Sequence, residues 1–199
     1  KLCLEGPRNT SIYSDGVFGN ATGIQSCKDA VTNDKIRNAL LTASQIGKVP
    51  TGVIMAIWQE ETSCSHVNNV DPINDTSLYQ NNNEICVQRG CDVRGPFQFK
   101  DDTFASIITK SEFTACRAAI GVDISTTPLR NRWGDGLCAN AIKLGEDGLA
   151  SNLESWDDNN TKNAARSYLG ACTDLGVDYC GDILKLAKEY TDLVKTVNR

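Results

Sequence analysis

The spacing of apolar residues along the chain predicts a mostly helical protein. From Asn33 the apolar positions fall on one stripe, and similar helical patterns return over residues 101–110, 112–120, 137–149, 162–168 and 180–197. Residues 52–62 differ, because their first two turns are apolar on every side, which is typical of a helix buried at the centre of a domain. No long alternating run predicts an extended strand.

Two stretches lack a helical period. Residues 1–33 begin with a polar, glycine-punctuated loop up to residue 30, and Cys3 and Cys27 are candidates to hold it by disulfides. Residues 65–92 are rich in Asn and Asp, and we interpret them as an insertion with a small hairpin, pinned by Cys86 and Cys91. The glycines at 134 and 136 predict a turn. With 199 residues, the chain suits a single, mainly α domain over residues 1–199.

Cysteine usage indicates an oxidising compartment. The chain has nine cysteines, no Cys-x-x-Cys pair and a single histidine, His66, so disulfides explain the set better than zinc ligands do. Glycosylation sequons agree with this, and they start at Asn9, Asn20, Asn74 and Asn159. We therefore expect a secreted, extracellular glycoprotein that has already lost its signal peptide, and an odd count leaves one cysteine over.

Charge and hydropathy exclude several partners. The formal net charge is −5, the sequence pI is about 4.9, and no basic block is present, which argues against binding to nucleic acid or to an anionic membrane. The longest unbroken apolar run covers only residues 53–58, so no segment of the sequence is expected to span a membrane.

Exclusion of the other common catalytic groups leaves catalysis by carboxyl groups. His66 is the only histidine, which argues against serine or cysteine nucleophiles that need a histidine base. Asp71, Asn74 and Asp75 do not follow the spacing of a calcium-binding loop, and no glycine-rich phosphate loop is present. We therefore expect no metal and no cofactor.

Glu61 is the candidate acid, because it lies at the end of the buried helix. Burial and the helix dipole both raise the pKa of a carboxyl group at that place. A carboxylic acid that stays protonated near neutral pH is what cleavage of a glycosidic bond requires. The alternative is that Glu60 and Glu61 simply mark the solvated end of the helix.

Two further segments carry candidate binding groups. Residues 95–99 read GPFQF, a turn in which the amide of Gln98 lies between two aromatic rings, an arrangement suited to a sugar. The alternative is a tight turn whose rings belong to the core. In the other segment Tyr168 follows two small residues at 164 and 165, and its hydroxyl is a candidate to orient a carboxyl group or, more commonly, to cap a core.

These segments, in this order, resemble the lysozyme-like family of soluble lytic transglycosylases and goose-type lysozymes. In that family a buried helix ends in Glu-Ser, which is similar to AIWQEET at residues 56–62, with Glu61 in the place of the catalytic acid. A Gly-Leu-Met-Gln turn, followed five residues after its Gln by Thr, resembles GPFQF and Thr103. A small-small-x-Tyr-Asn-Gly element and a following Tyr-x-x-x-hydrophobic-Leu helix resemble AARSYLG at 164–170 and YCGDIL at 179–184.

The resemblance implies a lysozyme-like α+β domain with a central buried helix and a secreted muramidase that cleaves β-1,4 bonds between MurNAc and GlcNAc of peptidoglycan. Glu61 would be its general acid. In hydrolases of the family, aspartates between the first two motifs hold the attacking water, and Asp92 and Asp101 are the nearest candidates here. The resemblance places substrate contacts at Phe97, Gln98, Phe99, Thr103 and Tyr168. This chain departs from the family at Leu169, where Asn is usual, and in its insertion at 65–92.

Several alternatives remain open at this point. A lytic transglycosylase would use the MurNAc 6-hydroxyl in place of water and release 1,6-anhydro products. A chitinase would act on a neutral glycan, which suits the acidic charge of the chain better than an anionic wall does. A non-catalytic glycan-binding module would not need a buried acid, and a cysteine-rich interaction protein would leave the ordered motifs as coincidence. In the favoured interpretation the partner is a polysaccharide and the protein is a monomer.

Overall fold

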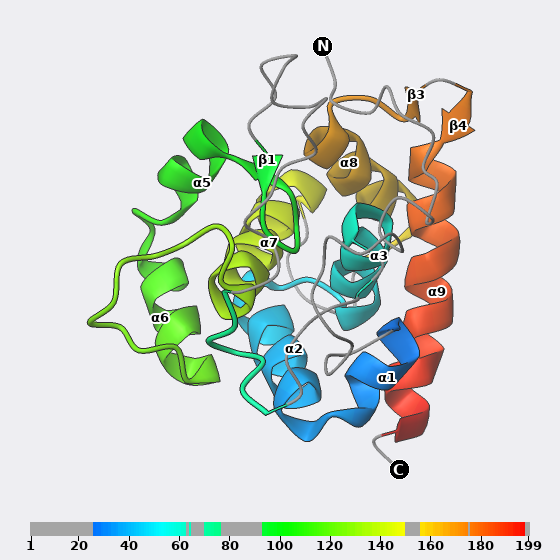
Figure 1. The fold of residues 1–199 in the computed structure, drawn as a ribbon. Helices are drawn as coiled ribbons and strands as arrows, with labels where there is room; N and C mark the ends of the chain where they lie inside the picture. The colour runs from blue at the N-terminus through cyan, green and yellow to red at the C-terminus, as the bar shows by residue number, and fades with distance from the viewer. Residues whose placement is uncertain are drawn as a thin grey trace, which may run out of the picture.

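The computed structural model describes residues 26–62, 64, 70–76, 93–149, 156–174 and 176–197, and these residues are mainly helical (Figure 1). The helices are α1 (Cys27–Thr32), α2 (Asp34–Gly47), α3 (Thr51–Thr62), α5 (Asp101–Ile107), α6 (Ser111–Ile120), α7 (Trp133–Gly148), α8 (Asp158–Leu169) and α9 (Tyr179–Val197). Two short antiparallel hairpins accompany them, β1 (Val93–Arg94) with β2 (Phe99–Lys100) and β3 (Thr173–Asp174) with β4 (Val177–Asp178). The mainly α class predicted from the apolar spacing is confirmed.

Side-chain caps set where two of the helices begin. The side chain of Asn33 accepts hydrogen bonds from the backbone amides of Lys35 and Ile36 at the start of α2. Asp157 caps α8 in the same way through the amide of Asn160. Because of this polar cap, α8 begins at residue 158, ahead of the apolar pattern that predicts a start at 162.

Two local predictions are wrong. Residues 134–136 do not form a separate turn, because they lie in the first turn of α7. The two glycines serve close packing there: a Cβ atom on Gly134 would lie 2.8 Å from the carbonyl oxygen of Ile73, and one on Gly136 would lie 3.0 Å from the ring of Phe97. Residues 27–30, expected in the N-terminal loop, belong to α1, which the side chain of Ser26 caps.

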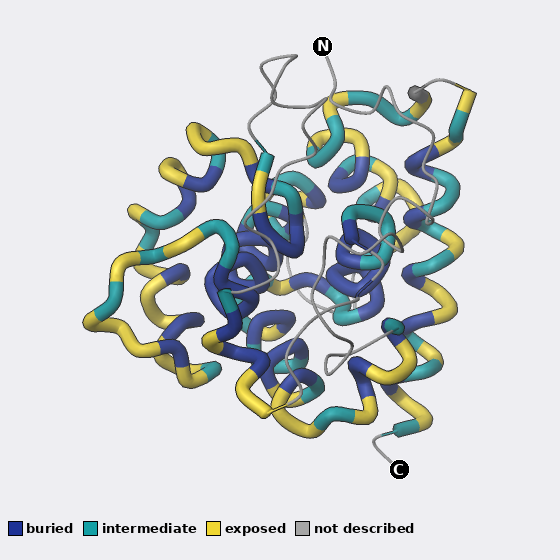
Figure 2. The backbone as a smooth tube through the Cα atoms, viewed as in Figure 1, coloured by how far each residue is buried: buried dark blue, intermediate teal, exposed yellow. Residues whose placement is uncertain are grey.

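Helix α3 lies inside the helical assembly, and every residue from 52 to 58 is buried (Figures 1 and 2). The helix packs along α9, where Gly52 permits a close approach, since a Cβ atom there would lie 2.3 Å from the carbonyl oxygen of Ala187. Helices α2 and α7 also contact α3, and the rings of Trp58 and Trp133 meet at 5.4 Å. Full burial of one large apolar side chain contributes about 1.5–3 kcal/mol. The predicted helix buried on every side is confirmed.

Among the described residues, three disulfides tie the elements together: Cys27–Cys64, Cys116–Cys138 and Cys172–Cys180. The first joins α1 to the chain just after α3, the second joins α6 to α7, and the third joins the segment before β3 to the first turn of α9. The predicted disulfide bonding is confirmed, and it indicates an oxidising environment. The remaining cysteines, at 3, 86 and 91, lie outside the described residues, as do the loop up to residue 25 and most of the insertion at 65–92.

Within the described ranges, no single helix is long and apolar enough to cross a membrane. Helices α2 and α3 reach that length and composition only as a pair, and they are bent by 113° where they join.

Candidate active site

The carboxyl group near the end of α3 meets a tyrosine from the start of α9. Tyr179 is only 1% exposed, and its hydroxyl donates a hydrogen bond to Oε1 of Glu61 at 3.0 Å. Glu61 itself is half-buried and is the next-to-last residue of α3. A contact from a buried group restricts the rotamers of the side chain that it touches. The carboxyl group that the sequence singles out is therefore oriented by the fold.

Both partners of this pair are anchored covalently nearby. Cys64 follows Glu61 by three residues and is bonded to Cys27 in α1. Cys180 follows Tyr179 directly and is bonded to Cys172. A crosslink beside each partner reduces the freedom of both backbone segments, so the disulfides help to keep the pair together.

The turn between β1 and β2 packs against α3 and α8. Thr62, the last residue of α3, donates through Oγ1 to the carbonyl oxygen of Pro96 at 2.8 Å. Tyr168, near the end of α8, donates through its hydroxyl to the carbonyl oxygen of Phe97. The three segments that carry the predicted motifs are therefore in contact, although Phe97 and Tyr168 are 71 positions apart in the chain.

Gln98 forms two hydrogen bonds within this turn. Its side-chain Nε2 and its backbone N–H both donate to the carbonyl oxygen of Gly95, at 2.6 and 3.1 Å. Gln98 has a φ of +49°, which few residues other than glycine adopt, and Gly95 has a φ of +83°. The side-chain Nε2 of Gln98, which the sequence predicts to bind a sugar, thus donates a hydrogen bond within the turn. The Gln98 side chain is half-buried.

The two phenylalanines of the turn lie in the core. Phe97 is 0% exposed and Phe99 is 3% exposed. The Phe97 ring packs on Trp58 at 6.0 Å, and the Phe99 ring stands edge-on to Tyr168 at 5.7 Å. This is the core role that the sequence leaves open as an alternative, and direct contact of either ring with a substrate stays a prediction.

Tyr179, which binds Glu61, and Tyr168, which binds the Phe97 carbonyl, remain neutral donors. Burial raises the pKa of Tyr179 well above its usual value, and the negative charge of Glu61 raises it further. Burial and the charge of Glu61 raise the pKa of Tyr168 in the same way, with a further contribution from Asp147. Because both hydroxyls keep their protons across the physiological range, both hydrogen bonds persist.

Tyr179 is the site residue that the sequence does not assign. The sequence marks it only as the first residue of a helical motif, and it offers Tyr168 as the group that orients a carboxyl. In the structure the Tyr168 hydroxyl binds the Phe97 carbonyl, and the Tyr179 hydroxyl binds Glu61. No local pattern distinguishes the two, because the Tyr179 contact joins residues 118 positions apart.

The two aspartates predicted to hold water have different outcomes. Asp92 lies outside the described residues. Asp101 is the first residue of α5, where its side chain is 81% exposed and forms an ion pair with Arg130 at 3.2 Å. The water-holding role of either residue stays a prediction, and Arg130 is a partner that the sequence does not indicate.

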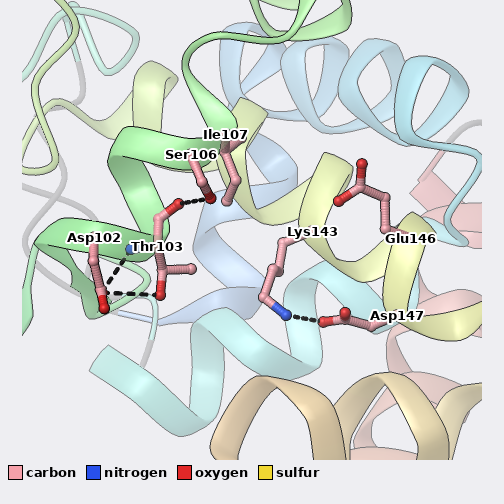
Figure 3. A pocket seen from close by; sticks show the side chains of 7 residues that line it. All are labelled: Asp102, Thr103, Ser106, Ile107, Lys143, Glu146 and Asp147. Atoms are coloured by element: carbon pink, nitrogen blue, oxygen red, sulfur yellow. Dashed lines mark hydrogen bonds and ion pairs between the residues drawn. The ribbon is translucent and has the colours of Figure 1, made fainter.

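Thr103 lies on α5 at the edge of a hollow of about 360 Å³ between α5 and α7 (Figure 3). Figure 3 shows Asp102 and Thr103 on α5 facing Lys143 and Asp147 on α7. Lys143 forms an ion pair with Asp147, and the backbone amide of Thr103 donates to Asp102 at 2.7 Å. Among the described residues, Glu61 does not line this hollow, so its carboxyl group and the hollow are separate features.

Neither a metal site nor a known relative defines the chemistry. Over the described ranges, no three His, Cys, Asp or Glu side chains gather as metal ligands would.

Comparison of the chain with known proteins finds no matching family model, no matching curated protein and no matching solved structure. Function is therefore inferred from the residues of the site.

Proposed function

We propose that this protein is a secreted glycoside hydrolase of the lysozyme-like type, a muramidase in which Glu61 protonates the glycosidic oxygen of a β-1,4-linked N-acetylated glycan. One observation carries the proposal, namely the convergence of the predicted motifs around one carboxyl group. Glu61 at the end of α3 is bound by Tyr179 of α9, and its neighbour Thr62 is bound to the turn that Tyr168 also holds. The lysozyme-like assignment of the mainly α fold belongs to the same proposal.

The contact with Tyr179 supports catalysis over mere glycan binding. A binding module needs hydrogen-bonding and aromatic groups, but it does not need a carboxyl group positioned by a buried phenol. An acid catalyst needs a carboxyl group held within hydrogen-bond reach of the leaving oxygen, because misplacement lowers the rate steeply. The hydrogen bond from Tyr179 holds the Glu61 carboxyl group in one orientation, and this supports the catalytic role.

The proposed reaction conserves protons. Glu61 transfers its proton to the glycosidic oxygen, the C–O bond breaks, and the leaving sugar departs as an alcohol while the other sugar gains oxocarbenium character. Water held on the opposite face of the sugar then attacks the anomeric carbon and gives its proton to a second carboxylate, for which Asp92 and Asp101 are the candidates, while Glu61 regains its proton from solvent. In the alternative transglycosylase reaction, the MurNAc 6-hydroxyl attacks in place of water and forms a 1,6-anhydro ring.

Peptidoglycan is the proposed substrate, and chitin is the alternative that charge favours. A protein of net charge −5 is not steered toward an anionic wall, whereas a neutral polymer imposes no such repulsion. The disulfides are consistent with secretion, where both polymers are encountered.

Product analysis tests the proposal. Purified peptidoglycan is incubated with the wild type, with Glu61→Gln and with Glu60→Gln, a matched control at the neighbouring position of the same helix, and soluble products are identified by mass spectrometry. We expect reducing-end muropeptides from the wild type and from Glu60→Gln, and a loss of about 10²-fold or more in Glu61→Gln. Circular dichroism checks that each variant is folded.

Each other outcome has a defined meaning. Anhydro-muropeptides would identify a transglycosylase with the same acid. Products from chitin oligomers alone would change the substrate and keep the role of Glu61. No products from either polymer, or equal activity in Glu61→Gln and the wild type, would overturn the proposal.

A further inference from the structure

The loop between α6 and α7 is built around buried charges. Figure 1 shows this loop, residues 121–132, running outward from α6 and returning to α7. The carboxylate of Asp135, which is 0% exposed, is paired with Arg117 and with Arg132, each at 2.7 Å. The same carboxylate accepts the backbone N–H of Leu129 at 2.8 Å. A buried carboxylate with three such donors fixes the loop, which supplies two of them, Leu129 and Arg132.

The two arginines also hold the loop through its carbonyl groups. Arg117 donates to the carbonyl oxygens of Asp123 and Thr126, at 3.1 and 2.8 Å. Arg132 donates to the carbonyl oxygen of Thr127 at 3.2 Å. The loop has no regular secondary structure, yet its backbone is bound at several points to charges in the interior. The position of its last residues is thereby defined.

Arg130, near the end of this loop, contacts the 95–99 turn at its first and last residues and the start of α5. Its guanidinium group donates to the carbonyl oxygen of Phe99 at 3.1 Å and pairs with Asp101 at 3.2 Å. Its own carbonyl oxygen lies against Gly95, where a Cβ atom would come within 1.8 Å of it. Arg130 therefore touches the first residue of the turn and the residues that follow it.

We propose that Arg130 is a positioning residue of the candidate active site, which holds the 95–99 turn in place against Thr62 at the end of α3, next to Glu61. This inference rests on the proposed function. The turn is bound on its other side by Thr62, the neighbour of Glu61, so the turn lies between Arg130 and the end of α3. Release of the turn from Arg130 displaces Gln98 and loosens the contact beside the acid.

The same arrangement gives Asp101 a role. Its carboxylate is bound to Arg130, so it helps to hold the guanidinium group at the hairpin. Asp101→Asn then has the kinetic effect of an Arg130 variant, a moderate loss that is smaller than the loss in Glu61→Gln. A water-holding aspartate would instead give a loss in kcat close to that of the acid itself.

Arg37 provides a matched control for Arg130. Like Arg130, it binds a backbone carbonyl oxygen, that of Val31 at 3.1 Å, and a carboxylate, that of Asp34 at 2.5 Å. It lies in α2, whereas the hairpin leads into α5 on another side of the molecule (Figure 1). Loss of either arginine removes the same kinds of contact, but only one of them touches the turn.

The experiment compares Arg130→Gln, Arg130→Lys and Arg37→Gln by glycan turnover and by hydrogen exchange of peptides covering residues 95–101. We expect kcat/KM to fall about 10- to 100-fold in Arg130→Gln, with partial recovery in Arg130→Lys and no change in Arg37→Gln. The Gln98 amide, which donates to Gly95, exchanges faster only in the Arg130 variants. Wild-type kcat/KM and wild-type exchange in Arg130→Gln would overturn the inference.

Failure of the proposed function is distinguishable from failure of this inference. If the wild type and Arg37→Gln cleave no glycan, the proposed function is wrong. Hydrogen exchange then still decides whether Arg130 holds the turn, because that measurement needs no substrate.

Discussion

The hydroxyl of Tyr179 lies 3.0 Å from the carboxyl oxygen of Glu61, although 118 positions separate the two residues in the chain. A second pair joins the same two helices, since the hydroxyl of Tyr190 donates to Oε1 of Gln59 at 2.9 Å. Both pairs link α3 to α9 by a tyrosine hydroxyl, but only the first ends on a carboxyl group. The second pair is therefore an internal control for the first.

Tyr179→Phe removes the hydroxyl that orients Glu61 and leaves the ring in place. We expect kcat for glycan cleavage to fall about 10- to 100-fold while KM changes little, because the acid loses its orientation and the turn is kept. Tyr190→Phe removes the equivalent contact to Gln59, and kcat should stay within about twofold of the wild type. Steady-state kinetics on the substrate identified by product analysis checks both, and equal losses in the two variants would contradict the assigned role of Tyr179.

Thr62→Val removes the hydrogen bond that joins the end of α3 to the turn. Thr62 is 4% exposed and its partner is the carbonyl oxygen of Pro96, so loss of the hydroxyl leaves a buried acceptor without this donor. We expect the free energy of unfolding to fall by about 1–3 kcal/mol, measured by urea denaturation. Hydrogen exchange over residues 95–99 should also become faster.

The control for Thr62 is Thr161→Val. Thr161 is buried to a similar extent, and its hydroxyl donates to the carbonyl oxygen of Asp157 at the start of α8. This variant loses a comparable hydrogen bond without touching the turn. Equal exchange rates at the turn in the two valine variants would show that the Thr62 contact does not hold the turn.

Stability at high pH depends on the buried tyrosines. Their pKa in the folded state is raised, chiefly by burial, well above the value of about 10 that an unfolded tyrosine has. The folded protein therefore keeps protons that the unfolded chain loses, so this contribution to stability is complete below pH 10 and declines as pH rises toward the folded-state pKa. Each such tyrosine adds a slope of up to about 1.4 kcal/mol per pH unit.

Urea denaturation between pH 8 and pH 11 checks this prediction. We expect the free energy of unfolding to fall above pH 10 and the fall to become shallower in Tyr168→Phe and in Tyr179→Phe. Tyr190, whose pKa burial raises to about 12, contributes in the same direction. An unchanged slope in both phenylalanine variants would mean that neither hydroxyl is shielded from solvent in the folded state.

The helices and the buried position of α3 are predictable because their signals are local. Residues 52–58 are apolar on every side, and a segment of that kind is stable only when neighbours surround it, whichever neighbours these are. Helix starts are less predictable, because polar first turns carry no apolar period. Asp157 and Ser26 extend or create helices where the apolar pattern alone indicates none. The glycines at 134 and 136 show the same limit, since a glycine serves a turn and a close packing contact equally well.

The candidate site also contains some residues that the sequence predicts and others that only the structure identifies. The sequence by itself singled out Glu61, the 95–99 turn and Tyr168, because a carboxyl group ending an apolar helix and an amide between aromatic rings are visible in a few consecutive residues. Only the tertiary structure decided that Tyr179 binds Glu61, that Phe97 and Phe99 pack in the core, and that Arg130 binds Asp101. Such partners lie far apart along the chain, and the free energy that selects them comes from burial and geometry in the assembled fold rather than from any local pattern.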